Sequence, residues 1–150
     1  MAVVRGDIFI DRPPEAVFDV LADERNEPRY NSQMVSAELL TGEPVGPGSR
    51  FRATMRTPGR PLVMLVEVTA LERPRYVGTR TTMPGADIAG GLFLSPEGGG
   101  TRMRWCWHVE ARGPLRLLGP LAAWIGRREE RAIWGNLKRL LEKGAAEPSH

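Results

Sequence analysis

The feature that most constrains this chain is a run of strand-like segments followed by a single long helical segment. The clearest strand signal covers residues 101–109, where apolar and polar side chains alternate strictly. Glycine- and proline-rich turns separate this segment from its neighbours by only a few residues. Because parallel strands need a crossover of a dozen or more residues, these turns predict an antiparallel sheet. One amphipathic helix laid on one face of such a sheet gives an α+β fold.

Seven segments carry strand signals, so a sheet of six to seven antiparallel strands is expected. They cover residues 3–10, 34–40, 49–57, 62–71, 76–83, 88–94 and 101–109. Two short helices are expected after the first strand. Arg12-Pro13-Pro14-Glu15 predicts the start of one, because prolines and a glutamate suit a first helical turn. The other is expected at residues 28–31.

The long helix is expected to begin at Leu115 or at Gly119-Pro120, and to end at Lys143. At about 100° per residue its apolar side chains share one broad face. These side chains are Leu118, Ala122, Ile125, Ile133, Leu137 and Leu140. Gly144 suits a helix end, so the chain reads as a single domain over residues 1–144 with a frayed tail at 145–150.

Composition argues against several classes of function. The net charge is +3, but acidic residues interrupt the densest basic group, at 127–131, so no nucleic-acid partner is expected. The single cysteine, Cys106, and the two histidines, His108 and His150, leave too few ligands for a structural metal site. No cofactor motif is present. The charged N-terminus is neither a signal peptide nor a membrane span, which favours a cytoplasmic location.

Five short motifs point to a known superfamily. They read IDRPPEAVF (10–18), PRYN (28–31), VGPGSRF (45–51), GGTRM (99–103) and LKRLL (137–141). In these motifs and their order the sequence resembles the polyketide cyclase/dehydrase and lipid-transport superfamily, the START-like or Bet v 1-like proteins. The resemblance covers nearly the whole chain and implies a helix-grip fold, in which a curved sheet wraps a long helix and encloses a cavity. It does not fix the function, because this fold hosts carriers, aromatases, cyclases and regulatory modules.

The expected cavity suits an aromatic or lipid-like ligand, because methionines and tryptophans provide adaptable and flat apolar walls. The expected ligand-binding residues are Phe51, Met55, Met64, Val66, Val77, Thr79, Thr81, Leu92, Met103, Trp105, Trp107 and Ile125. Binding of a hydrophobic or aromatic small molecule, without a cofactor, is therefore the favoured function. One alternative is an aromatase/cyclase that promotes aldol cyclisation and dehydration of a poly-β-ketone. Another is a small regulatory or interaction module with a vestigial cavity.

Glu129 and Tyr30 are the candidate catalytic residues for the cyclase alternative. Glu129 lies four residues after Ile125 and four before Ile133, so the helical wheel places it within the apolar stripe, facing the cavity. A desolvated carboxylate there would suit general acid–base chemistry. The alternatives are a helix bend or rotation that takes Glu129 to solvent, or a pairing of Glu129 with an arginine across the sheet. Tyr30 resembles the aromatic residue that family members place near the cavity mouth, and bracing of two helices is its alternative role.

The opposite face of the sheet is expected to carry no catalytic group. Strict alternation in residues 101–109 places His108 and Cys106 on the face away from Trp107, so His108 is expected at the surface. Val63 and Leu65 also point outward. With Cys106 they would form an apolar patch for a homodimer, unless they are scattered single exposures.

Overall fold

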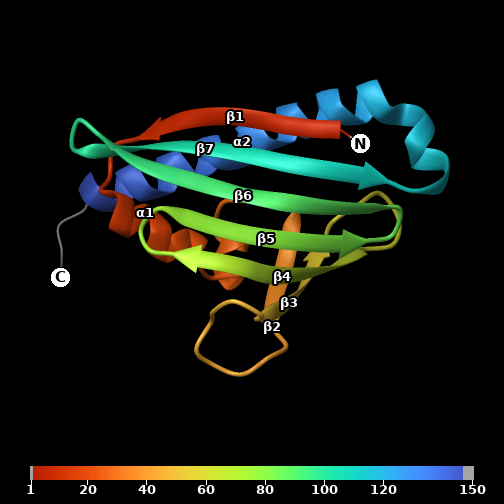
Figure 1. Ribbon diagram of the computed structural model, residues 1–150, viewed down its shortest axis with the longest axis horizontal. Helices are drawn as coiled ribbons and strands as arrows, with labels where there is room; N and C mark the ends of the chain where they lie inside the picture. Colours follow the sequence, from red (N-terminus) through yellow and green to blue (C-terminus); the bar gives the residue numbers. More distant parts are fainter. Residues whose placement is uncertain (1, 147–150) are drawn as a thin grey trace.

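The computed structural model describes the backbone of residues 2–146 and the side chains of residues 2–114, 116 and 128–144. Its elements follow the expected order, as Figure 1 shows. They are β1 (Ala2–Ile10), α1 (Pro14–Leu21), the 3-10 helix η1 (Glu24–Arg29), β2 (Met34–Leu39), β3 (Arg50–Met55), β4 (Leu62–Glu72), β5 (Tyr76–Met83), β6 (Ala86–Glu97), β7 (Gly100–Ala111), the 3-10 helix η2 (Gly113–Leu118) and α2 (Gly119–Ala146).

The seven strands form one antiparallel sheet in the order β1-β7-β6-β5-β4-β3-β2. This order follows from the short turns, because each strand from β2 to β7 pairs with the strand before or after it in the chain. Only β1 is placed by a long-range pairing, with β7. The predicted antiparallel sheet and long helix are therefore confirmed.

Some helix boundaries differ from the sequence prediction. The second short helix precedes its expected place at 28–31, because the Asp23 side chain caps η1 by accepting a hydrogen bond from the Arg25 amide. Tyr30 is the residue that follows η1. Of the two expected starts for the long helix, the later one, Gly119, is correct, and η2 precedes it as a separate turn. The helix continues two residues past Gly144, and the rest of the expected tail, 147–150, lies outside the described residues.

The pairing register shows which side chains share the concave face. On β7, Met103 and Trp105 are buried, whereas Arg104 and His108 are exposed. Leu92 on β6 pairs with Val77 on β5 and with Trp105 on β7, so these three side chains share one face of the sheet. The predicted inward and outward faces of this strand are therefore confirmed.

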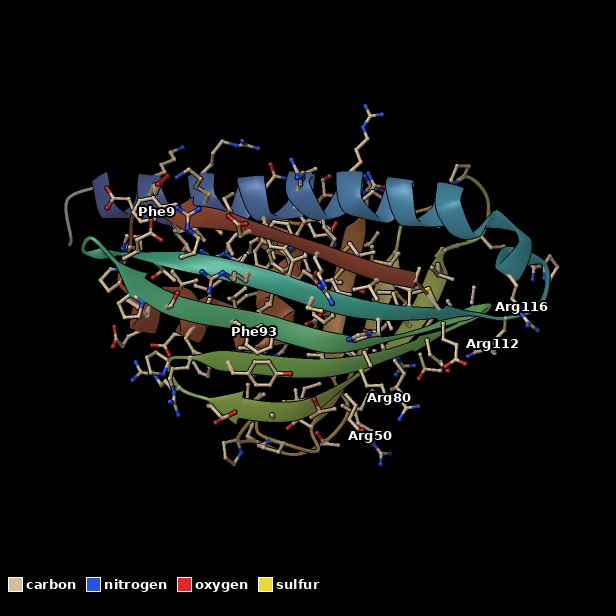
Figure 2. The ribbon with its side chains drawn as sticks, turned by 45° about the horizontal axis from the view of Figure 1, so that its top comes forward. Phe9, Arg50, Arg80, Phe93, Arg112 and Arg116 are labelled. Carbon is tan, nitrogen blue, oxygen red and sulfur yellow. The ribbon has the colours of Figure 1, made fainter. Side chains whose placement is uncertain are left out.

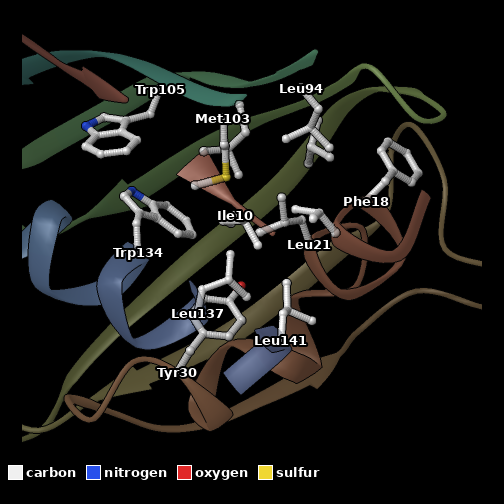
Figure 3. Close-up of a cluster of buried hydrophobic side chains, with 13 residues drawn as sticks. Ile10, Phe18, Leu21, Tyr30, Leu94, Met103, Trp105, Trp134, Leu137 and Leu141 are labelled. Atoms are coloured by element: carbon white, nitrogen blue, oxygen red, sulfur yellow. The ribbon is translucent and has the colours of Figure 1, made fainter. Parts of the chain in front are cut away.

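Two buried clusters fill the concave side. The larger joins β1, β5, β6 and β7 to α1 and α2, and Figure 3 shows its side chains converging. Its members are Ile10, Val17, Phe18, Leu21, Tyr30, Val77, Leu92, Leu94, Met103, Trp105, Trp134, Leu137 and Leu141. The smaller lies under β2, β3 and β4 and contains Met34, Phe51, Ala53, Val66 and Val68.

Polar contacts fix α2 along the edge strand β1. The Lys138 ammonium donates to the Phe9 carbonyl at 2.8 Å, and the Asp11 amide donates to the Glu142 carboxylate at 3.1 Å. The Arg12 guanidinium donates to the Leu141 carbonyl at 3.0 Å. These bonds hold α2 against the C-terminal end of β1, which is an edge strand of the sheet.

Candidate functional site

The expected ligand-binding residues share one face of the sheet, but they differ in how completely they are covered. Phe51, Val66, Val77, Leu92, Met103 and Trp105 are buried. Met55, Met64, Thr79, Thr81 and Trp107 are only half-buried. The side chain of Ile125 lies outside the described side chains. The half-buried set lies where β4 begins and toward the ends of β5 and β7.

The carboxylate that α2 turns toward the sheet is Glu130, and the prediction for Glu129 is wrong by one residue. Glu129 is exposed. Glu130 lies one helical turn before Trp134 and two turns before Leu137, both of which are buried against the sheet. The predicted stripe includes Ile133 and Leu140, which are only half-buried, and leaves out Trp134, which is buried. A stripe centred on Trp134 and Leu137 places Glu130 inward instead.

Two indole donors hold Glu130 in place. Trp107 Nε1 on β7 donates to Glu130 Oε2 at 3.1 Å, and Trp134 Nε1, on the same helix, donates to the same oxygen at 2.6 Å. Among the described side chains, both hydrogen bonds go to Oε2 and none goes to Oε1. The carboxylate is therefore fixed in orientation, and one of its oxygens is left for another partner.

The surroundings of Glu130 favour its neutral form. Burial raises the pKa of the Glu130 carboxyl to about 7, while the hydrogen bonds from Trp134 and Trp107 lower it and the charges of Glu27 and Glu129 raise it. Burial and the adjacent Glu24 carboxylate likewise raise the pKa of Glu27. A carboxyl group with a pKa near neutrality exchanges protons readily at physiological pH, as a general acid or base must.

An aromatic column borders this carboxyl group. The ring centroids of Tyr30 and Trp134 are 5.9 Å apart, and those of Trp134 and Trp105 are 6.1 Å apart. Tyr30 is only 5% exposed, so its ring is packed in the core rather than displayed at a cavity mouth. Burial and the charges of Glu27, Glu24 and Glu130 raise the pKa of the Tyr30 hydroxyl, which keeps it protonated.

Trp105 contributes a buried donor that has no acceptor. Its side chain is 3% exposed, and Nε1 has no hydrogen-bond partner. The ring lies directly over Gly6 of β1, where an added Cβ would stand 2.2 Å from Trp105 Cζ2. Figure 3 shows the indole nitrogens of Trp105 and Trp134 on the same side of the cluster, away from Leu94. A buried N–H without a partner is costly, so this group needs an explanation.

The outer face of the sheet carries the other residues singled out in the sequence. Val63 and Leu65 are 49% and 40% exposed and line an open depression of about 500 Å³ with Leu40 and Arg52. Cys106 and His108 lie on this face, with Sγ and Nε2 3.9 Å apart. Figure 2 shows Phe93 and Arg80 on the same face. The depression lies on the opposite side of the sheet from Glu130, so it belongs to a different surface.

The chain matches one protein-family model over residues 1–142, the family described as polyketide cyclase / dehydrase and lipid transport. The chain belongs to this family. A comparison with curated protein sequences finds no match.

Solved structures of other proteins share the fold at low sequence identity. A START superfamily protein from Mycobacterium smegmatis superposes with a TM-score of 0.81 at 16% identity, covering 94% of this chain and 97% of that one. The Zhui aromatase/cyclase from Streptomyces sp. R1128 gives 0.77 at 16% identity, covering 95% and 94%. Ara h 8.0201 gives 0.77 at 14% identity, covering 95% and 98%. These likenesses show the START-like and Bet v 1-like helix-grip fold.

The described residues contain no cluster of three or more His, Cys, Asp and Glu side chains that could hold a metal ion. None of the helices, within the part of the chain that the structure describes, is long and apolar enough to cross a membrane.

Proposed function

We propose that this protein binds a hydrophobic or aromatic small molecule between the concave face of its sheet and α2. The observation that carries the proposal is the half-buried inward set, Met55, Met64, Thr79, Thr81 and Trp107. A sheet that curves around a helix normally buries its inward side chains, so partial exposure on this face supports a site that a ligand would fill. Membership of a family of polyketide cyclases and lipid-transport proteins supports the same conclusion.

Titration with N-phenyl-1-naphthylamine, a neutral apolar fluorophore, tests this proposal. Its emission should rise saturably, with one molecule bound per chain, because an apolar site excludes water from the dye. Thr79→Phe fills the inward space and should weaken binding at least tenfold. Thr82→Phe, on the outward face of the same strand, is the matched control and should leave binding within twofold. Equal effects of the two substitutions, or no saturable signal, would refute the proposal.

The second candidate function is the aromatase/cyclase, and one observation favours it. Glu130 combines a pKa near 7 with a hydrogen bond to Trp134, whose ring packs near that of Trp105, and the buried N–H of Trp105 has no acceptor. In an aldol closure the Glu130 carboxylate would remove a proton from a methylene between two ketones. The Trp105 N–H would donate to the carbonyl oxygen on which negative charge develops.

Mass spectrometry of a synthetic poly-β-ketone thioester incubated with the protein tests the cyclase candidate. Loss of one water per closed ring should be accelerated by the protein. Glu130→Gln should reduce this rate on the order of a hundredfold or more while fluorophore binding persists. Glu129→Gln is the control and should retain the rate. If Glu130→Gln is as active as the wild type, Glu130 is not the acid–base group.

A further inference from the structure

We propose that the ligand is anchored at its inner end by a single neutral hydroxyl group, which accepts a hydrogen bond from Trp105 Nε1 and donates one to the Glu130 carboxylate. This inference rests on the proposed function, because it specifies the chemistry of the ligand in that site. It starts from two groups to which no hydrogen bond is made by the side chains that the structure describes. One is the buried Trp105 N–H without an acceptor, and the other is Glu130 Oε1, since the described donors both use Oε2.

The two groups belong to one neighbourhood. Trp134 contacts both of them, because its ring centroid lies 6.1 Å from that of Trp105 and its Nε1 lies 2.6 Å from Glu130 Oε2. The Trp105 and Trp134 nitrogens lie on the same side of the aromatic cluster in Figure 3. The Trp105 N–H therefore lies on the same side of the cluster as the Trp134 N–H, which is the group that binds Glu130.

The chemistry of the two groups selects the ligand. A hydroxyl group has one donor hydrogen and two acceptor lone pairs, so one oxygen atom satisfies an indole donor and a carboxylate acceptor together. An ammonium group would satisfy Glu130 but would leave the Trp105 N–H facing another donor. A carboxylate ligand would accept from Trp105 but would meet Glu130 and Glu27, whose charge already acts on Glu130. A hydrocarbon would leave both groups without partners, at a cost in affinity.

The test is displacement of N-phenyl-1-naphthylamine at pH 8 by four probes that share one ring system. They are naphthalene, 2-naphthol, 2-naphthoate and 2-naphthylmethylammonium. We expect 2-naphthol to bind at least tenfold more tightly than each of the other three. Trp105→Phe and Glu130→Leu should each reduce the advantage of 2-naphthol over naphthalene to threefold or less. Glu129→Gln, which changes the exposed neighbour, should keep that advantage.

A measurement on the unmodified protein makes the test independent of how the variants fold. The indole N–H resonance of Trp105 should move downfield on saturation with 2-naphthol and stay within its line width on saturation with naphthalene. Equal affinities for 2-naphthol and naphthalene, tighter binding of 2-naphthoate or the ammonium, or an unmoved Trp105 resonance would each overturn the hydroxyl anchor. These outcomes would leave the binding function standing. Failure of the fluorophore itself to bind would instead refute the proposed function, and the anchor with it.

Discussion

Replacing Glu130 by glutamine should change how the stability of the protein depends on pH. Burial raises the pKa of Glu130 from its ordinary 4.5 to about 7 in the folded state. At pH values between these two pKa values, Glu130 therefore keeps its proton in the folded protein and has lost it in the unfolded chain. For an acid whose pKa is raised by folding, stability is greatest where both states are protonated and falls as pH rises through the folded pKa.

The size of this effect follows from the two pKa values. Each unit corresponds to roughly 1.4 kcal/mol, and integrating the linkage from pH 5 to pH 8.5 gives a loss of about 2.5 kcal/mol in the free energy of unfolding. Glutamine cannot ionise, so the Glu130→Gln variant should not suffer this loss. The substitution also changes the free energy of unfolding by an amount that does not depend on pH. Apart from that amount, the free energy of unfolding of the variant should rise by about 2.5 kcal/mol relative to the wild type from pH 5 to pH 8.5.

Urea denaturation followed by tryptophan fluorescence at pH 5 and pH 8.5 measures both free energies. Glu129→Gln is the control, and its difference from the wild type should change by less than about 0.5 kcal/mol, because that side chain is exposed. Glu27 is present in all three proteins, so its own titration largely cancels. In the wild type, the indole N–H resonances of Trp107 and Trp134 should titrate with a midpoint of about 7. Parallel pH profiles for Glu130→Gln and the wild type would refute a folded-state pKa of about 7 for Glu130.

Two further substitutions test the packing around the site. Gly6→Ala should cost roughly 1–3 kcal/mol and alter the near-UV circular dichroism, because the new methyl group would displace the Trp105 ring. Gly42→Ala, which meets open space, should change stability by less than about 0.5 kcal/mol. Thr101→Val should cost about 1–3 kcal/mol in thermal or urea unfolding, since Thr101 is 0% exposed and its hydroxyl donates to the Arg12 carbonyl at 2.7 Å. A near-neutral result for Gly6→Ala would mean that the Trp105 ring is free to move.

The faces of the strands could be predicted from the sequence because side-chain alternation in a strand has a period of two. If Met103 and Trp105 point inward, Arg104 and His108 must point outward, because successive side chains of a strand alternate between its faces. Short turns left only antiparallel pairing between neighbours, so most of the sheet order followed as well. The pairing of β1 with β7 is the exception, because these two strands lie far apart in the sequence.

The sequence could not predict, to within one residue, which side chains of the helix turn toward the sheet. Successive residues on a helix differ by about 100°, and a broad apolar stripe leaves its centre undefined within that angle. Which of Glu129 and Glu130 turns inward depends on where α2 meets the sheet. The positions of Trp107 on β7 and of the β1 edge set that contact, and both are tertiary features. The absence of an acceptor for the Trp105 N–H could not be predicted either, because it results from the packing of the indole ring against Gly6.

The place of α2 in the chain has a consequence for synthesis. This helix follows all seven strands, yet it packs against the first strand and supplies Trp134 and Leu137 to the core. A nascent chain on the ribosome therefore completes its sheet before the helix that shields it has emerged. During that interval Trp105, Met103 and the open β1 edge face water, and exposed apolar strands with an unpaired edge are prone to aggregate. We expect emergence of α2, rather than completion of the sheet, to be the moment at which this apolar face becomes shielded from water.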